Sequence, residues 1–135
     1  MRDHEAANAS TVREYLGALE SGVSGQALAR FFTSDARQVE LPNRLNPGGG
    51  ESDLATLLRR SEQGRQLLSE QRYEVTSEVA QGDRVAVEAK WTGTLAVPLG
   101  TLQSGAVMKA HFAMFFEFLD GRIRVQRNYD CFEPW

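Results

Sequence analysis

The sequence predicts an α+β domain, in which helices near the N-terminus pack on an antiparallel sheet formed by the second half of the chain. Three observations lead to this prediction. Apolar residues recur with helical spacing as far as about Leu68, they alternate with polar residues after Glu70, and Asp120-Gly121 is a strong hairpin-turn signal. No helical pattern alternates with the later strands, so a parallel, doubly wound sheet is not expected.

Composition sets the domain organisation and excludes several classes of protein. A chain of 135 residues with 41% hydrophobic and 24% charged residues is typical of a globular protein, and we expect residues 1–135 to form one domain with a frayed end over 1–8. The net charge is -3 and the basic residues are scattered, so nucleic acid is not an expected partner. The longest apolar stretch, 110–116, is too short to cross a bilayer and the N-terminus has no apolar segment, which indicates a cytoplasmic protein with no membrane partner.

The sequence gives no sign of a metal or a cofactor. Cys131 is the only cysteine, and one cysteine with two distant histidines, His4 and His111, is a poor basis for a metal site. The glycines of 48–50 precede a helical pattern but follow none of the spacings that cradle a nucleotide phosphate. We therefore expect neither a metal nor a cofactor.

Three helices are expected in the first half of the chain. The first spans about 11–22 and begins at a capping box at Thr11, the second is short and begins at Ser24, and the third begins at Ser52. Gly64 weakens the middle of the third helix, whose other face is basic. Their apolar stripes are formed by Val12, Tyr15, Leu16 and Leu19, by Ala27, Leu28, Phe31 and Phe32, and by Leu54, Leu57 and Leu58.

Five strands are expected. The first covers 36–41 and is followed by a segment rich in proline and glycine, 42–50, which is typical of a mobile loop that could close a pocket. Tight turns then join the remaining strands in an antiparallel meander. These strands cover 73–80, 84–97, 106–119 and 122–132.

Three segments of the chain resemble the nuclear-transport-factor-2-like superfamily. TVREYLGALESG at 11–22 is similar to its first helix, FFTSDA at 31–36 resembles the segment that follows, and FFEFLDGRIRVQRNYD at 115–130 is similar to its last hairpin. The superfamily includes SnoaL-like polyketide cyclases, ketosteroid isomerases, limonene epoxide hydrolases and dehydratases. The resemblance implies three helices on a strongly curved sheet, a cone-like half barrel with an apolar pocket.

The resemblance also suggests a function, which the residues of the pocket must decide. It implies cofactor-free acid–base chemistry, as in a cyclase, isomerase or dehydratase, on a hydrophobic, oxygenated small molecule such as a polyketide or steroid-like ring system. The alternative is a non-catalytic member that binds an apolar ligand or another protein.

Glu40 is the first candidate base. It lies five residues after Asp35, and the same count in ketosteroid isomerases leads to the carboxylate that shuttles a proton. A carboxylate in an apolar pocket has its pKa raised towards neutrality, which suits that task. The flanking Val39 and Leu41 favour an alternative in which Glu40 lies on the solvated side of its strand.

The last strand supplies two more candidates. Gln126, Asn128 and Asp130 share one face of it, because alternate residues of a strand point the same way. Resemblance to the epoxide hydrolases places a pocket carboxylate nearest to Asn128. Asparagine can hold a substrate oxygen but cannot take its proton, so an acid at this place would have to be Asp130. Alternatively, both side chains face solvent near the edge of the sheet.

Tyr15 and His111 complete the candidate catalytic set. Tyr15 lies where the isomerases place a phenol that stabilises an oxyanion, although its place on an apolar helical stripe fits core packing equally well. His111 has the side chain most often used as a general acid or base. Strand alternation nevertheless puts it on the outer face of the sheet with Lys109 and Glu117, unless a bulge shifts the register.

The outer face of the sheet is expected to need a partner. Helices on the inner face cannot cover it, and exposed aromatic surface of this kind marks an interaction site. A homodimer through that face would bury it, with Phe132 and Trp135 either at the dimer seam or over the pocket mouth. The side chains expected to be exposed there are Trp91, Phe115, Val125 and Tyr129.

Overall fold

In the computed structural model, which describes residues 2–135, three helices pack on a six-stranded mixed sheet, and the chain is an α+β protein. The helices are α1 (Arg2–Glu20), the 3₁₀ helix η1 (Gly25–Phe31) and α2 (Leu54–Leu67). The strands are β1 (Phe32–Glu40), β2 (Gly50–Asp53), β3 (Leu68–Gln81), β4 (Arg84–Leu95), β5 (Val107–Leu119) and β6 (Arg122–Phe132).

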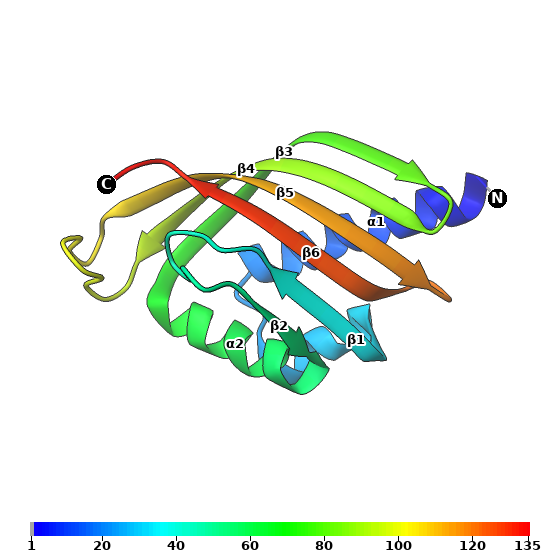
Figure 1. The fold of residues 1–135 in the computed structure, drawn as a ribbon, viewed down its shortest axis with the longest axis horizontal. Coiled ribbons are helices and arrows are strands. Elements are labelled where there is room, and N and C mark those ends of the chain that lie inside the picture. The colour runs from blue at the N-terminus through cyan, green and yellow to red at the C-terminus, as the bar shows by residue number, and fades with distance from the viewer. Residues whose placement is uncertain (1) are drawn as a thin grey trace.

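The strands lie side by side in the order β2-β1-β6-β5-β4-β3 (Figure 1). The meander from β3 to β6 is antiparallel, as the sequence predicts, but β1 pairs with β6 in parallel, so the expectation of a purely antiparallel sheet is wrong. Parallel neighbours require a long connection, and here β2 to β5 all lie between the two strands in the sequence. The sequence analysis also missed β2, whose four residues, GESD, carry no apolar alternation.

The helices lie on one face of the sheet (Figure 1). Helix α1 packs against β3 and β4, and α2 packs against η1 and β1. Within the part of the chain that the structure describes, no helix covers the opposite face. None of the described helices is long and apolar enough to span a membrane.

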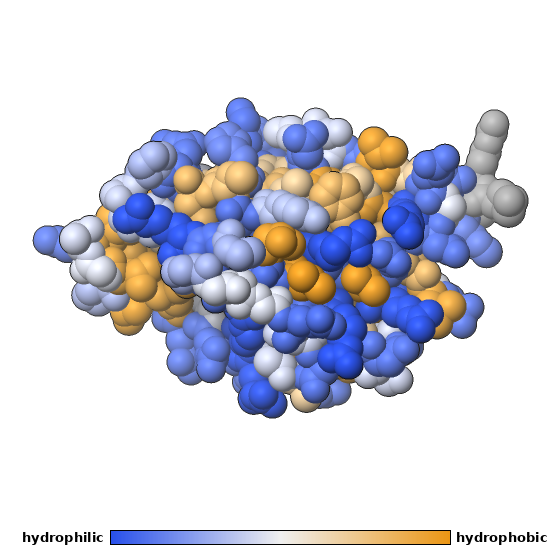
Figure 2. All heavy atoms as spheres, in the orientation of Figure 1, coloured by the Kyte–Doolittle hydropathy of each residue, from blue (hydrophilic) through white to orange (hydrophobic). Residues whose placement is uncertain are grey.

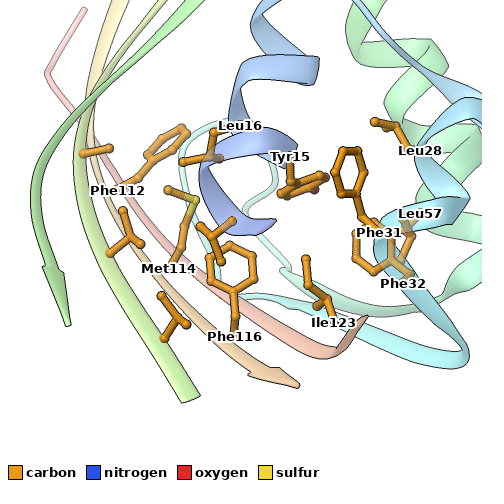
Figure 3. Close-up of a cluster of buried hydrophobic side chains, with 14 of the residues drawn as sticks. Tyr15, Leu16, Leu28, Phe31, Phe32, Leu57, Phe112, Met114, Phe116 and Ile123 are labelled. Atoms are coloured by element: carbon orange, nitrogen blue, oxygen red, sulfur yellow. The ribbon is translucent and has the colours of Figure 1, made fainter. Parts of the chain in front are cut away.

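Alternate side chains of the meander form the core against the helices, as strand alternation predicts (Figure 3). Trp91 belongs to this inner face, because it pairs with the buried Ala110 and is itself only 4% exposed. Its expected place on the outer face is therefore wrong. The buried side chains of β4 and β5 are Val85, Val87, Ala89, Trp91, Leu95, Met108, Ala110, Phe112, Met114, Phe116 and Phe118.

Helix α1 begins earlier than the capping box suggested. Among the described residues it starts at Arg2, so residues 2–8 are helical, whereas Met1 lies outside the described part. The Thr11 hydroxyl donates to the Ala7 carbonyl one turn back instead of capping the helix. Ala9 is buried and extends the apolar stripe towards the N-terminus, which explains why the helix continues beyond the predicted start.

Two glycine substitutions test this packing, and they should change the free energy of unfolding in opposite directions. A Cβ at Gly93 would collide with the Trp91 indole, so Gly93→Ala should lower the free energy of unfolding by about 1–3 kcal/mol. A Cβ at Gly64 of α2 meets no atom within 4 Å, so Gly64→Ala should raise it by about 0.5–1 kcal/mol. Urea unfolding of both variants measures the difference, and a neutral Gly93→Ala would contradict the packing described.

Candidate active site

A cavity of about 210 Å³ lies between the helices and the inner face of the sheet, and it collects polar side chains that are far apart in the sequence. Its apolar wall includes Met114, which lies near Leu16 in the buried cluster (Figure 3). The lining side chains are Tyr15, Leu16 and Leu19 of α1, Gln38 and Glu40 of β1, Arg60 and Ser61 of α2, Tyr73 of β3, Met114 of β5, and Gln126 and Asn128 of β6.

The buried amide of Gln126 organises the polar wall of this cavity. Its side-chain oxygen accepts hydrogen bonds from the Tyr15 hydroxyl at 3.2 Å and from the Gln38 amide at 3.1 Å. Its nitrogen in turn donates to Oδ1 of Asn128 at 3.0 Å. This bond occupies the Asn128 oxygen and leaves the Asn128 amide nitrogen as the group that can donate to a ligand.

The Tyr15 ring packs in the core and its hydroxyl group makes a hydrogen bond in the cavity. The residue therefore combines the packing role and the hydrogen-bonding position that the sequence left as alternatives. Its ring makes edge-to-face contacts with Phe31, Phe32 and Phe116, and the residue is only 4% exposed. Burial raises the pKa of the Tyr15 hydroxyl to about 12, although the hydrogen bond to Gln126 opposes the shift. Tyr15 therefore remains a protonated donor whose hydrogen points at Gln126.

Glu40 lines the cavity but both of its carboxylate oxygens have partners. Oε1 lies 2.6 Å from the guanidinium of Arg60, and Oε2 accepts from the Asn43 amide at 2.7 Å. The Glu40 side chain is 18% exposed, which is less than a solvated strand position would give. The Arg60 guanidinium thus supplies the counter-charge to this carboxylate.

Asp130 differs from Glu40 because the residue is half-buried and one of its carboxylate oxygens is buried without a partner. Among the described residues, its Oδ1 is the only buried side-chain polar atom with no hydrogen-bond partner. Burial, and to a smaller extent the negative charge of Glu40, raises the pKa of Asp130 from 3.8 to about 7. Its cross-strand partner is the buried Phe112, so the carboxyl group lies beside the aromatic core at the far end of the row that begins with Gln126.

His111 lies apart from the other four candidates. Its side chain is 60% exposed on the outer face of β5 and its Nε2 lies 3.3 Å from a carboxylate oxygen of Glu133. It borders a larger hollow of about 540 Å³ together with Lys90 and Lys109. The structure therefore brings Glu40, Asn128, Asp130 and Tyr15 to the inner face and places His111 on the opposite one.

Sequence reasoning missed four side chains of the cavity, Ser61 among them. Arg60 belongs to the basic face recognised on the third helix, but nothing in the sequence showed that it would reach Glu40. Gln38 shares a face with Glu40 by strand alternation and could have been found from that parity. Tyr73 was noted only as the start of a strand. No group of three or more His, Cys, Asp or Glu side chains suited to a metal occurs among residues 2–135.

Residues 12–126 match the pattern that defines the SnoaL-like domain, and the chain belongs to this family. AclR from Streptomyces galilaeus, a proposed hydroxylase, is similar in structure with a TM-score of 0.79 and 19% identity, over 96% of this chain and 82% of that chain. IdmH from Streptomyces antibioticus, a proposed polyketide cyclase, gives a TM-score of 0.76 and 20% identity, over 91% of each chain.

A third similar structure is a Catenulispora acidiphila protein with a ketosteroid isomerase-like fold, solved in complex with trimethylamine. Its TM-score is 0.70 and its identity 16%, over 88% of this chain and 83% of that chain. At these identities the likeness shows the fold alone. No curated protein matches the sequence.

The raised pKa of Asp130 should make stability depend on pH with a definite sign. The folded protein keeps the proton up to about pH 7, whereas the unfolded chain releases it near pH 4, so stability should fall as the pH rises through this window. Asp130→Asn removes the ionisation. The variant should therefore melt at a higher temperature than the wild type at about pH 8 and at an equal temperature near about pH 4.

Thermal unfolding followed by circular dichroism over this pH range measures the effect. Asp83→Asn, which makes the same substitution at an exposed aspartate in the turn after β3, is the matched control. A difference between Asp130→Asn and the wild type that stays constant with pH would contradict the burial of this carboxyl group.

Proposed function

We propose that the protein is a cofactor-free enzyme that moves a proton on a hydrophobic, oxygenated small molecule, as a cyclase, isomerase or dehydratase does. The observation that carries the proposal is the unpartnered Asp130 carboxyl group beside a fixed row of hydrogen-bonding side chains. A pKa of about 7 lets this group both accept and return a proton near neutral pH. The 210 Å³ cavity, in a sheet that we propose curves into a half barrel, would hold the substrate. Asp130 is not part of the lining of this cavity and lies two residues beyond the lining residue Asn128, on the same face of β6.

The proposed roles follow from the hydrogen bonds. Asp130 takes a proton from a carbon next to a substrate carbonyl, and the amide nitrogen of Asn128 donates to the carbonyl oxygen as negative charge develops there. Two residues apart on one face of β6, the two side chains are separated by about 7 Å, which suits a ring-sized substrate. Tyr15 positions Asn128 through Gln126, and Glu40 with Arg60 forms a polar wall.

Proton return completes the reaction in one of two ways. Asp130 can hand the proton to a different carbon, which is an isomerisation. Alternatively the carbanion attacks a second carbonyl, which closes a ring, and Asp130 returns the proton to the alkoxide oxygen that this attack forms. The family membership and the proposed cyclase activity of IdmH support the second outcome. The trimethylamine complex of the Catenulispora acidiphila protein supports a cavity that accepts a small molecule.

Exchange of α-protons for deuterium tests the proposal without knowledge of the natural substrate. We expect the protein to accelerate the exchange of the α-protons of 1-tetralone for deuterium in D₂O, measured by proton NMR. The Asp130→Asn substitution should lower this exchange rate by about 100-fold or more. Glu40→Gln should slow it far less, because the Glu40 carboxylate is held in an ion pair with Arg60. Loss of exchange in Glu40→Gln but not in Asp130→Asn would instead make Glu40 the base.

A non-catalytic role in binding an apolar ligand is the second candidate. It would be favoured if the cavity bound aromatic ketones with unchanged affinity in Asp130→Asn while the wild type exchanged no α-protons. The desolvated carboxyl group argues against this role, because a purely apolar ligand would gain nothing from it.

We also propose that the protein forms a homodimer through the outer face of the sheet. Apolar side chains lie between charged ones over β5 and β6 (Figure 2), and they include Phe115 and Tyr129, whose rings are 5.6 Å apart. Val79 of β3 adds to this patch, and the three residues are 39%, 42% and 61% exposed, respectively. Lys90 and Glu133 on the same face allow charge pairing between two copies in an isologous contact.

Sedimentation equilibrium should find the wild type as a dimer and Phe115→Glu as a monomer, because an isologous contact brings both introduced carboxylates to one interface. Leu45→Glu is the control, since Leu45 is 38% exposed in the segment between β1 and β2 and should leave the dimer intact. A monomeric wild type would contradict the proposed dimer.

A further inference from the structure

Tyr73 occupies a position in the cavity that neither the sequence analysis nor the proposed mechanism uses. It lies on β3 opposite Trp91, on the inner face of the sheet. It lines the 210 Å³ cavity and an adjoining hollow of about 460 Å³ between the ends of α1 and α2, which shares Leu19 and Ser61 with it. It also lines the hollow of about 540 Å³ that borders His111. Tyr73 therefore lies where these spaces meet, beside any molecule that extends from the 210 Å³ cavity into a neighbouring one.

The structure fixes the ring of Tyr73 and leaves its hydroxyl group free. The ring packs edge-to-face on Phe112 with centroids 6.1 Å apart, and the backbone N–H of Tyr73 donates to the Glu20 carboxylate at 2.5 Å. In the described part of the chain its hydroxyl makes no hydrogen bond, whereas the hydroxyl of Tyr15 is engaged by Gln126. Of the two tyrosines that line the cavity, Tyr73 is thus the one able to donate to a ligand.

Asp130 lies close enough to Tyr73 for their charges to matter. Burial raises the pKa of the Tyr73 hydroxyl, and the charges of Tyr15, Asp130 and Glu20 raise it further. The phenol consequently keeps its proton near neutral pH, where it can donate a hydrogen bond.

We propose that Tyr73 is a further catalytic residue, whose hydroxyl donates a hydrogen bond to the substrate oxygen that becomes negative. The inference rests on the proposed function. When Asp130 removes the proton, the carbon–hydrogen bond breaks, its electron pair forms a carbon–carbon double bond, and the carbonyl π pair moves onto oxygen. The proton goes to the Asp130 carboxylate, and Tyr73 keeps its own proton within the hydrogen bond. Asn128 on β6 and Tyr73 on β3 then hold the oxygen from two sides of the cavity.

A phenolate ion tests this role directly, because its ring-bound negative oxygen resembles the enolate that the mechanism forms. We would measure 4-nitrophenolate binding by absorbance to Asp130→Asn, which removes the repelling carboxylate, at about pH 8, where most of the probe is ionised. The probe should bind Asp130→Asn and bind Asp130→Asn/Tyr73→Phe about 10- to 100-fold more weakly, the effect of losing one hydrogen bond to a charged group.

Two controls separate this role from a structural one. Tyr129→Phe on the Asp130→Asn background removes a hydroxyl on the outer face and should leave phenolate affinity unchanged. The methyl ether 4-nitroanisole, which carries no negative oxygen, should bind equally with and without the Tyr73 hydroxyl.

The outcomes distinguish a failure of this inference from a failure of the proposed function. Tight phenolate binding to Asp130→Asn that Tyr73→Phe leaves unchanged would overturn the role of Tyr73 and leave the site intact. An equal loss of phenolate and 4-nitroanisole would show that Tyr73 only shapes the cavity, which also overturns the role. Failure of phenolate to bind any variant would contradict the oxyanion site itself, and with it both proposals.

Discussion

The side-chain amide of Gln126 ties together the elements that form the cavity. It is 2% exposed, and through its hydrogen bonds it joins α1 at Tyr15, β1 at Gln38 and β6 at Asn128. A buried amide without partners would cost several kcal/mol, so these bonds strongly restrict where the three elements can lie. The parallel pairing of β1 with β6 contributes to this arrangement, because it places Gln38 directly beside Gln126.

In contrast to the hydrogen-bonded Gln126 amide, the Asp130 carboxyl group has an oxygen without a hydrogen-bond partner. Glu40 receives a guanidinium and an amide, but the Asp130 carboxyl group is left beside Phe112 with one oxygen unpartnered. This costs stability whenever Asp130 is ionised, and such a cost is a recurrent feature of sites where chemistry occurs. The two carboxylates therefore differ in environment, and this difference supports the proposed acid–base task for Asp130 and the proposed structural task for Glu40.

The sequence predicted the parts of the structure that depend on local periodicity. Strand alternation placed Met114 inside and His111 outside, and the order of elements identified the family. Periodicity could not show the parallel pairing of β1 with β6 or the pairing of Arg60 with Glu40, because both depend on contacts between distant segments. Strand alternation places Trp91 on the same apolar face of β4 as Val85. The expectation that Trp91 lies on the outer face was therefore inconsistent with the alternation pattern of its own strand.

The proposed chemistry requires that the partly buried Asp130 carboxyl group exchange its proton near neutral pH. Carbon-13 NMR of the aspartate carboxyl carbons, with Asp130 assigned by its loss in Asp130→Asn, measures that titration in the folded protein. We expect a midpoint close to 7, well above the ordinary value of 3.8. A midpoint at the ordinary value would mean that Asp130 is solvated and ionised throughout, and the proposed proton transfer would have no base.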